Sequence, residues 1–344
     1  MIISVIIPVY KVEKYIRRCL ESVIRQESDD YKIECLIIDD GSPDKSIEIV
    51  NEIVNNYKGT AISFTIINHK RNRGLSAARN TGIRASTGDY LFFIDSDDDL
   101  SDNAFKIFYA YSLEYPLVDV IIGNSLLFGR KNLSNTYAMN AVDVPYLIDE
   151  RNKLLNMVLR RRLNRNAWNK LIRRSLVIDN DLFFDIGLLY EDVTWTYRLY
   201  SYVSSILVVP EITYKYEYNP TSIVHTPAER SRQLIWSLAF ISDYILNNPP
   251  LIKEHETLFT AHCLFVNYWM LKAIDLYNKY GVDPITKQKM YNIKKRLLWQ
   301  SVRHVRPFMF FYFLVMFKPF SRIMNVRCFR ANVDRICRIV YFLS

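Results

Sequence analysis

Short apolar runs rich in β-branched residues alternate with helix-like segments along the first 125 residues. The strand-length runs cover residues 3–9, 34–38, 63–67, 90–94 and 118–122. Four segments between them carry apolar residues at three- and four-residue spacing, at 13–26, 45–57, 75–85 and 103–114. This alternation predicts an α/β fold in which helices cover both faces of a mixed, mostly parallel sheet. Ligands of such sheets bind beyond the carboxyl ends of the strands.

The pattern changes twice further along the chain. Residues 124–165 are less regular and contain one helical pattern, at 151–161. A helix at 191–203 and strand-like segments at 206–209 and 213–218 follow, and beyond them lie helical patterns at 229–246, 258–280 and 286–305. We therefore expect a domain over residues 1–226, divided into halves at residue 123, and a helical C-terminal region over 227–344.

Charge and cysteine content narrow the class of protein. The net charge of +9 belongs to the end of the chain, because from residue 285 onward 13 Lys or Arg face one acidic residue, Asp334. The five cysteines are scattered, which favours neither a zinc site nor a disulfide framework and fits a reducing compartment. The longest apolar stretch, 308–317, has about half the length of a membrane-spanning helix. With no secretion signal recognised at the N-terminus, these features predict a cytoplasmic location.

The densest polar cluster follows the fourth apolar run. Residues 91–94 are apolar, and four carboxylates then occur within five residues, at Asp95, Asp97, Asp98 and Asp99. Like charges this close repel one another unless a cation lies among them. Mg²⁺ and Mn²⁺ prefer oxygen ligands and keep coordination positions open for phosphate oxygens. A solvated loop that caps the next helix from Asp102 is the structural alternative.

Three further clusters occupy helix or strand ends. Residues 39–44 (DDGSPD) predict a turn in which Ser42 or Asp44 caps a helix. The two adjacent carboxylates before the cap, Asp39 and Asp40, are more than a cap needs and could bind the N–H edge of a base. In the cluster at 72–82, the positive charge of Arg79 near a helix start is unfavourable to the helix dipole unless an anion lies close to it. A diphosphate would supply that anion. The pair Glu191 and Asp192 opens a helix, where acidic residues are ordinary partners of the helix dipole.

Taken together and in this order, the clusters resemble the family 2 glycosyltransferases of GT-A fold. The match spans roughly residues 3–225 and rests on the following motifs: Pro8-Val9-Tyr10, residues 39–44, Asn72 with Gly74 and Ala78-Arg79-Asn80, Asp95-Ser96-Asp97-Asp98, Trp168-Asn169-Lys170 and Glu191-Asp192. The resemblance implies a nucleotide-binding half over residues 1–123 and an acceptor-side half over 124–226.

The resemblance also implies roles for individual residues. The uracil and ribose would be held by Pro8, Tyr10, Asp39 and Asp40, and the nucleotide and its phosphates would lie near Asn72 and Arg79. In the D-x-D pair, Asp97 would bind the Mg²⁺ or Mn²⁺ ion and Asp95 would contact the ribose or the donor sugar. The base would be Asp192, with Glu191 beside it.

These roles define a reaction. A carboxylate that takes the proton of an acceptor hydroxyl, followed by one displacement, inverts the configuration at the anomeric carbon. The expected donor is a nucleotide-diphosphate sugar, with UDP favoured by the resemblance, and the expected activity is that of a hexosyltransferase. The acceptor would be a glycan or a lipid-linked glycan, as in the synthesis of cell-surface polysaccharides.

Two other functions are compatible with parts of this pattern. A haloacid-dehalogenase-type phosphotransferase also uses D-x-D after a strand, but it needs Thr or Val where Asp99 stands and places the motif after its first strand. A non-catalytic nucleotide-sugar-binding or scaffold protein of the same fold is the other alternative.

The basic, aromatic C-terminal region favours peripheral contact with an anionic membrane, at the inner face of the plasma membrane, over helical packing. Nucleic acid is not expected as a partner.

Overall fold

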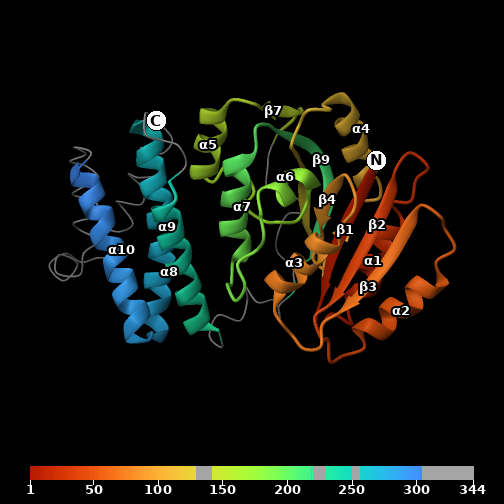
Figure 1. The fold of residues 1–344 in the computed structure, drawn as a ribbon, viewed down its shortest axis with the longest axis horizontal. Coiled ribbons are helices and arrows are strands. Elements are labelled where there is room, and N and C mark those ends of the chain that lie inside the picture. Colours follow the sequence, from red (N-terminus) through yellow and green to blue (C-terminus); the bar gives the residue numbers. More distant parts are fainter. Residues whose placement is uncertain (129–141, 218, 220–229, 250–255, 304–344) are drawn as a thin grey trace. The chain divides into compact units, whose positions relative to one another are not determined.

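The computed structural model describes residues 1–128, 142–217, 219, 230–249 and 256–303 (Figure 1). Its strands are β1 (Ile2–Val9), β2 (Lys32–Asp39), β3 (Ile62–Asn68), β4 (Tyr90–Phe93), β5 (Asp99–Leu100), β6 (Val120–Phe128), β7 (Tyr146–Ile148), β8 (Lys170–Arg173) and β9 (Ile206–Glu217). Its helices are α1 (Ile16–Ile24), α2 (Ser46–Asn56), α3 (Leu75–Ala85), α4 (Ala104–Glu114), α5 (Arg151–Leu159), α6 (Arg174–Asp179), α7 (Glu191–Tyr202), α8 (Ser231–Asn247), α9 (Glu256–Tyr280) and α10 (Pro284–Arg303).

The described strands form one mixed sheet. Its order is β3-β2-β1-β4-β8-β6-β9-β5, and β7 pairs with β9. The pairing directions make β1, β2, β3, β4, β6 and β9 run one way, while β5, β7 and β8 run the other way. The expected mostly parallel α/β sheet is therefore confirmed.

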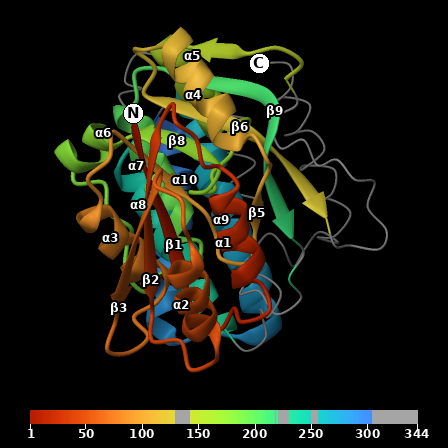
Figure 2. The same cartoon turned by 90° about the vertical axis from the view of Figure 1, so that its right-hand side faces the viewer.

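Strand β1 is buried on both faces, as expected for a strand inside a parallel sheet. Ile3 and Val5 belong to the core cluster that also contains side chains of α1, α2 and α4. Ile6 points to the opposite face, where α3 packs so closely that a Cβ added at Gly82 would lie 2.4 Å from Ile6 Cγ2. Figure 2 shows α3 on one side of β1 and β2, with α1 and α2 on the other.

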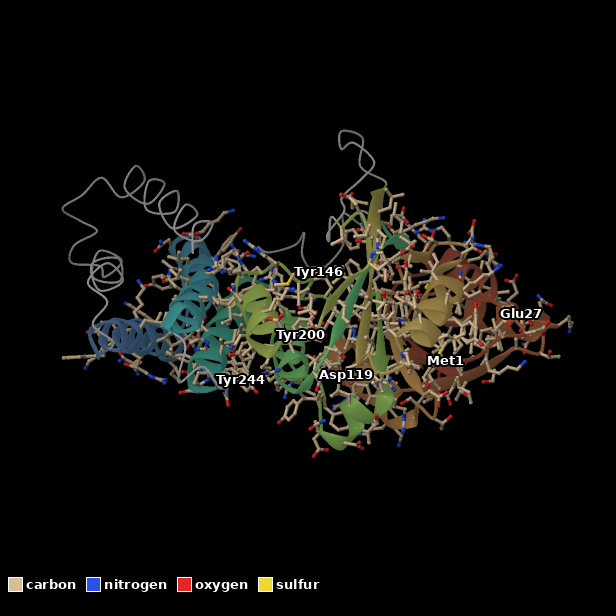
Figure 3. All side chains as sticks on the ribbon, turned by 90° about the horizontal axis from the view of Figure 1, so that it is seen from above. Met1, Glu27, Asp119, Tyr146, Tyr200 and Tyr244 are labelled. Carbon is tan, nitrogen blue, oxygen red and sulfur yellow. The ribbon has the colours of Figure 1, made fainter. Side chains whose placement is uncertain are left out.

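Contacts between residues divide the chain into two units. The first comprises residues 1–154 and 163–225, and the second comprises residues 155–162 and the chain from 226 onward. Within the first unit, Asp119 before β6 accepts a hydrogen bond from the Ser204 backbone, and Tyr200 of α7 is buried (Figure 3). Within the second, α8, α9 and α10 pack against one another. The independence of residues 1–226 as a domain stays a prediction.

Several elements differ from the sequence-based expectation. The two strand-like segments at 206–209 and 213–218 form the single strand β9, in which Pro210 lies close to the irregular register between β6 and β9, where a missing N–H donor is tolerated. Strands β5, β7 and β8 and helix α6 were not expected. None of the helices that the structure describes is long and apolar enough to cross a membrane. The apolar run at 308–317 lies outside the described residues.

The packing of α3 on β1 predicts the effect of adding one methyl group. Gly82→Ala should lower the free energy of unfolding by about 1–3 kcal/mol, because overpacking against Ile6 outweighs the better helix propensity of alanine. Urea unfolding followed by circular dichroism measures this change. In an Ile6→Ala background the same substitution should cost little or should stabilise. A Gly82→Ala protein as stable as the wild type would contradict the close packing.

Candidate active site

The ends of the parallel strands bring three of the sequence clusters to one edge of the sheet. Strands β1, β2 and β4 are parallel neighbours. Their carboxyl ends are followed by Tyr10, Asp40 and Asp95. This is the edge at which ligands of open α/β sheets bind.

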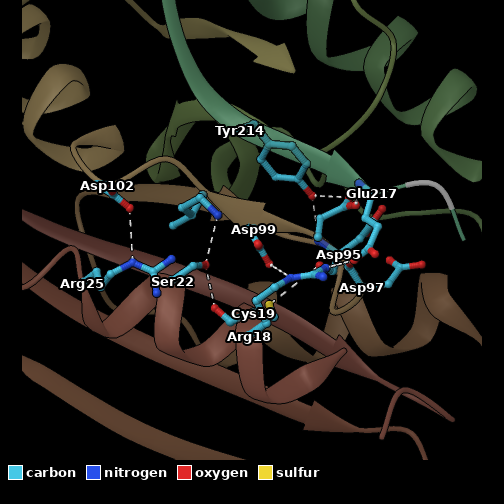
Figure 4. A network of polar contacts seen from close by, with 12 residues as sticks. Arg18, Cys19, Ser22, Arg25, Asp95, Asp97, Asp99, Asp102, Tyr214 and Glu217 are labelled. Atoms are coloured by element: carbon cyan, nitrogen blue, oxygen red, sulfur yellow. Dashed lines mark hydrogen bonds and ion pairs between the residues drawn. The ribbon is translucent and has the colours of Figure 1, made fainter. Parts of the chain in front are cut away.

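The acidic loop after β4 is held mainly by protein hydrogen bonds (Figure 4). Asp98 is buried, and its two carboxylate oxygens accept hydrogen bonds from the Tyr214 hydroxyl (2.7 Å) and the Glu217 backbone N–H (2.9 Å). Asp99 accepts a hydrogen bond from Arg18 Nε at 2.7 Å. Asp102 pairs with Arg25 at 3.3 Å, and α4 has no side-chain cap, so the alternative of a solvated capping loop is wrong.

Asp97 has one neutral side chain as its described hydrogen-bond donor. Its Oδ2 accepts a hydrogen bond from Asn219 Nδ2 at 2.9 Å. Burial raises the pKa of Asp97, and the charge of Asp95 adds to the rise. A divalent cation would relieve both effects. The residues that the structure describes contain no group of three metal-ligating side chains, so an ion held by Asp97 would need phosphate and water oxygens as further ligands. The carboxylate oxygens of Asp97 are of the ligand type that Mg²⁺ and Mn²⁺ prefer, so Asp97 fits an ion that the protein and the donor phosphates would hold together.

Arg79 joins the acidic loop to helix α7. Its Nη2 lies 2.7 Å from Asp95 Oδ1, and its Nη1 lies 2.7 Å from Glu191 Oε1. The Arg79 side chain is 3% exposed. The anions beside Arg79 are therefore the carboxylates of Asp95 and Glu191, whereas the sequence predicts a diphosphate there. Contact between Arg79 and the donor phosphates stays a prediction.

Helix α7 presents the expected base. Tyr190 has a left-handed backbone conformation (φ 60°), after which α7 begins with Glu191 and Asp192. Burial raises the pKa values of Glu191 and Asp192, and the charge of Arg79 opposes this rise in both. Asp192 Oδ1 is buried and has no hydrogen-bond partner among the described residues, whereas the residue as a whole is partly exposed. It can therefore accept a proton or a hydrogen bond from a substrate.

On the nucleotide side, Asp40 holds a loop. It accepts hydrogen bonds from the backbone N–H groups of Arg73 (2.9 Å) and Gly74 (2.7 Å), and it lies 2.6 Å from His69 Nδ1. His69 Nε2 lies 2.9 Å from Thr81 Oγ1 of α3. The carboxylate of Asp40, which is buried, thus fixes the segment around Asn72, and direct contact with a base stays a prediction.

The remaining nucleotide-side residues lie at the ends of β1 and β2 or in this loop itself. Pro8 is buried in β1, and Asp39 accepts a hydrogen bond from the Ser42 backbone at 2.8 Å. Tyr10 is 38% exposed, and Asn72 is exposed. Gly41 (φ 69°) has no room for a side chain, because a Cβ there would lie 2.9 Å from the Asn72 backbone nitrogen. Tyr10 and Asn72 are therefore the residues of this group that are most open to a ligand.

Comparison with known proteins establishes the family. The sequence profile described as Glycosyl transferase family 2 matches residues 4–190, which is more than half of the chain. The chain belongs to glycosyl transferase family 2. This confirms the resemblance seen in the motifs.

Several glycosyltransferases are similar to this chain over most of its length. Glycosyltransferase GlyA of Streptococcus pneumoniae serotype 4 is 28% identical over 88% of this chain and 42% of its own length. The uncharacterized glycosyltransferase EpsJ of Bacillus subtilis is 30% identical over 66% of this chain and 64% of its own length. Poly(ribitol-phosphate) beta-glucosyltransferase of Bacillus spizizenii is 29% identical over 63% of this chain and 32% of its own length. The chain thus spans between about a third and two thirds of these relatives.

Solved structures confirm the fold. Residues 1–349 of S. aureus TarS, crystallised in complex with UDP-GlcNAc, superpose with a TM-score of 0.66 at 22% identity, covering 87% of this chain and 81% of TarS 1–349. The mannosyltransferase PcManGT of Pyrobaculum calidifontis, in complex with GDP-Man and Mn²⁺, gives a TM-score of 0.54 at 13% identity over 95% of this chain and 84% of its own. The expected GT-A fold is confirmed.

Some contacts of the candidate site are not predicted from the sequence. Arg18 contacts Asp99, the Asp97 carbonyl and Glu217, and Asn219 contacts Asp97. These contacts join residues far apart in the chain, so no local motif indicates them. Lys170 lies in a motif that the resemblance included without a role, and the structure buries it completely.

The Arg79 ion pairs predict a pH-dependent stability. Arg79→Met should cost about 3–5 kcal/mol of unfolding free energy, because it leaves the buried Glu191 and the partly buried Asp95 carboxylates unpaired. The pKa of Glu191 is raised in the folded state, so the folded protein binds more protons and stability falls as pH rises. Loss of Arg79 raises that pKa further. The cost should therefore be larger at pH 8 than at pH 5 in urea unfolding.

Arg84→Met is the matched control on the same helix. Arg84 is exposed, and its guanidinium lies 4.4 Å from the centre of the Phe183 ring. Its loss should cost less than about 1 kcal/mol at either pH. Equal losses of unfolding free energy in Arg79→Met and Arg84→Met would contradict the stabilising role of the two Arg79 ion pairs.

Proposed function

We propose that the chain is a metal-dependent, inverting hexosyltransferase that uses a UDP-sugar. The observation that carries the proposal is the ion-pair bridge from Asp95 through Arg79 to Glu191. It connects the loop of the D-x-D pair to the helix that begins with Glu191 and Asp192. A nucleotide-sugar site and a base therefore belong to one connected arrangement, as a transferase needs.

The donor would lie against the strand ends. Tyr10, Asn72 and Asp39 would hold the nucleoside, and Asp97 would hold Mg²⁺ or Mn²⁺. A bound ion of this kind neutralises charge on the diphosphate that leaves. The UDP-GlcNAc complex of TarS and the GDP-Man and Mn²⁺ complex of PcManGT support a nucleotide sugar and a metal, respectively.

The base would be Asp192. Its buried Oδ1 has no partner within the described residues, and its raised pKa increases its affinity for a proton. A carboxylate within hydrogen-bond reach of an acceptor hydroxyl takes the proton as the hydroxyl oxygen bonds to the anomeric carbon. The bond from that carbon to the diphosphate oxygen breaks in the same displacement, so the configuration inverts. Glu191, paired with Arg79, positions the helix start.

The acceptor would be a glycan or a lipid-linked glycan in cell-surface polysaccharide synthesis. Two relatives support this class of pathway by their names: the poly(ribitol-phosphate) beta-glucosyltransferase of Bacillus spizizenii, and the minor teichoic acid biosynthesis protein GgaB of Bacillus subtilis, which is 31% identical over 40% of this chain and 16% of its own length. Acceptor contact by the half at 124–226 is part of the same proposal.

A panel of nucleotide sugars tests this function. With Mn²⁺ present, hydrolysis or transfer is expected from a UDP-sugar, and proton NMR of the transferred sugar should show an inverted anomeric centre. Asp192→Ala should lower kcat by roughly 10²–10⁴, and Asp97→Ala by at least about a hundredfold. Asp102→Ala is the control in the same loop, because its side chain is 71% exposed, and it should keep nearly wild-type activity. Activity that survives both Asp97→Ala and Asp192→Ala would refute the site.

Contact with an anionic membrane at the inner face of the plasma membrane is the second part of the proposal. Helix α10 contains six Lys or Arg and no acidic residue. Tyr291 and Trp299 are 52% and 62% exposed on it, and Lys287 and Lys295 are exposed as well. Basic and aromatic side chains on one helix are typical of interfacial binding. The basic and aromatic residues at 304–344 lie outside the described residues.

Charge reversal on α10 tests the membrane contact. Lys287→Glu with Lys295→Glu should weaken binding to vesicles containing phosphatidylglycerol at least about tenfold, since each lysine near an anionic surface contributes about 1 kcal/mol. Flotation measures the bound fraction. The control, Lys58→Glu with Lys106→Glu, changes the net charge equally at exposed positions of the other unit. Equal weakening by both pairs would contradict docking through α10.

A further inference from the structure

The D-x-D pair lies in a turn of four residues. The Asp98 backbone N–H donates a hydrogen bond to the Asp95 carbonyl oxygen at 3.0 Å, so these two residues close a β-turn. Ser96 and Asp97 occupy its two central positions. The place of the Asp97 carboxylate therefore depends on how the two ends of this turn are held.

One side chain holds both ends of the turn. The Tyr214 hydroxyl of β9 donates a hydrogen bond to Asp98 Oδ2 at 2.7 Å and accepts one from the Asp95 backbone N–H at 3.2 Å (Figure 4). Tyr214 is completely buried, so water does not compete for these bonds. The two hydrogen bonds, here named the Tyr214 bridge, connect the first and last residues of the turn through a single oxygen atom.

The Trp168-Asn169-Lys170 motif packs against the same part of β9. The Trp168 and Tyr214 rings are stacked, with 4.5 Å between their centres and 11° between their planes. Asn169 Oδ1 accepts a hydrogen bond from Thr213 Oγ1 at 2.7 Å. Two consecutive residues of the motif thus contact two consecutive residues of β9. These contacts fix the direction in which the Tyr214 ring carries its hydroxyl.

Contacts from other elements reach the tip of the turn. Arg18 Nη2 donates a hydrogen bond to the Asp97 carbonyl oxygen at 3.1 Å, and Asn219 Nδ2 donates one to Asp97 Oδ2 at 2.9 Å. Both side chains touch Asp97 itself, whereas Tyr214 touches the residues on either side of the tip. The Tyr214 bridge therefore sets the frame within which the tip contacts orient the Asp97 carboxylate.

We infer that Tyr214 is a positioning residue for the metal site: its hydroxyl holds the two ends of the D-x-D turn so that Asp97 presents its carboxylate to the divalent cation. The inference rests on the proposed function for the presence of that cation. It also gives a role to Trp168, whose ring supports that of Tyr214. Groups that orient a metal ligand without touching the metal commonly change metal affinity ten- to a hundredfold when they are lost.

Binding of Mn²⁺ in the presence of UDP tests the Tyr214 bridge without turnover. Tyr214→Phe keeps the ring and removes one oxygen atom, so Asp98 Oδ2 and the Asp95 N–H each lose a partner and the turn gains freedom. The Mn²⁺ dissociation constant, measured by electron paramagnetic resonance of the free ion at saturating UDP, should rise about tenfold or more. Equal Mn²⁺ affinity in the wild type and Tyr214→Phe would overturn the inference.

Tyr31→Phe is the matched control. Tyr31 is 3% exposed, its hydroxyl donates a hydrogen bond to the Gln26 carbonyl oxygen at 2.9 Å, and its ring contacts that of Tyr109. It precedes β2, at the end of the strand opposite the proposed site. Both substitutions should lower stability in urea unfolding, because each removes buried hydrogen bonding. Only Tyr214→Phe should change the Mn²⁺ dissociation constant, which a purely structural role would leave unchanged.

A double-mutant cycle tests the support from Trp168. Trp168→Leu should raise the Mn²⁺ dissociation constant in the wild type but should add little in Tyr214→Phe, because the indole ring acts on the turn through the Tyr214 hydroxyl. Equal increases in the two backgrounds would refute the role given to Trp168.

Kinetics separates the inference from the proposed function. In an active enzyme, Tyr214→Phe should raise the Mn²⁺ concentration needed for half-maximal activity and largely keep kcat at saturating Mn²⁺ and donor. Sugar transfer that requires Mn²⁺, with the same Mn²⁺ affinity in Tyr214→Phe, would refute the inference alone. Mn²⁺ binding that depends on Tyr214, in a protein inactive with every nucleotide sugar, would refute the function and support the inference. A wild type that binds no Mn²⁺ with UDP would refute both.

Discussion

The two ion pairs of Arg79 are the interaction on which the site depends. Asp95 and Glu191 approach from segments almost a hundred residues apart, and neither could be buried beside the other without a cation between them. Arg79 reaches both because α3 packs closely on β1, where Gly82 leaves no space beside Ile6. The packing of α3 on the sheet therefore determines whether Arg79 can balance the charges of Asp95 and Glu191.

The carboxylates at the strand ends fall into two groups according to their partners. Asp40, Asp98 and Asp99 accept hydrogen bonds from backbone or side-chain donors of the protein and hold loops in place. Asp97 accepts a hydrogen bond from one neutral side chain, and Asp192 Oδ1 has no partner among the described residues, so these two carboxylates have fewer protein donors, although burial raises the pKa of Asp98 as it does theirs. Carboxylates of the first kind form the frame. Those of the second kind have capacity left for a metal ion or a proton, as ligand-binding groups need.

The sequence predicted what local patterns encode. Helix α3 has the predicted bounds, and the clusters at Asp40 and Asp95 follow the predicted strands, because periodicity and turn residues act over a few positions. It did not predict β8 or the partners of Arg79. Strand β8 has four residues, and its identity comes from pairing with β4 and β6. Glu191 lies 112 residues from Arg79, and no local signal spans that distance.

The proposed reaction moves one negative charge across this arrangement. Asp192 loses its charge as it takes the proton of the acceptor hydroxyl, and the nucleoside diphosphate gains a charge as the bond to the sugar breaks. The net charge of the site is therefore the same before and after transfer. Arg79 contacts Asp95 and Glu191, so if it also lies near the donor phosphates, as predicted, the stabilisation that it would lose near Asp192 would be offset by what it would gain toward the diphosphate. A buried, fixed guanidinium suits this role, because it need not move while the charge does.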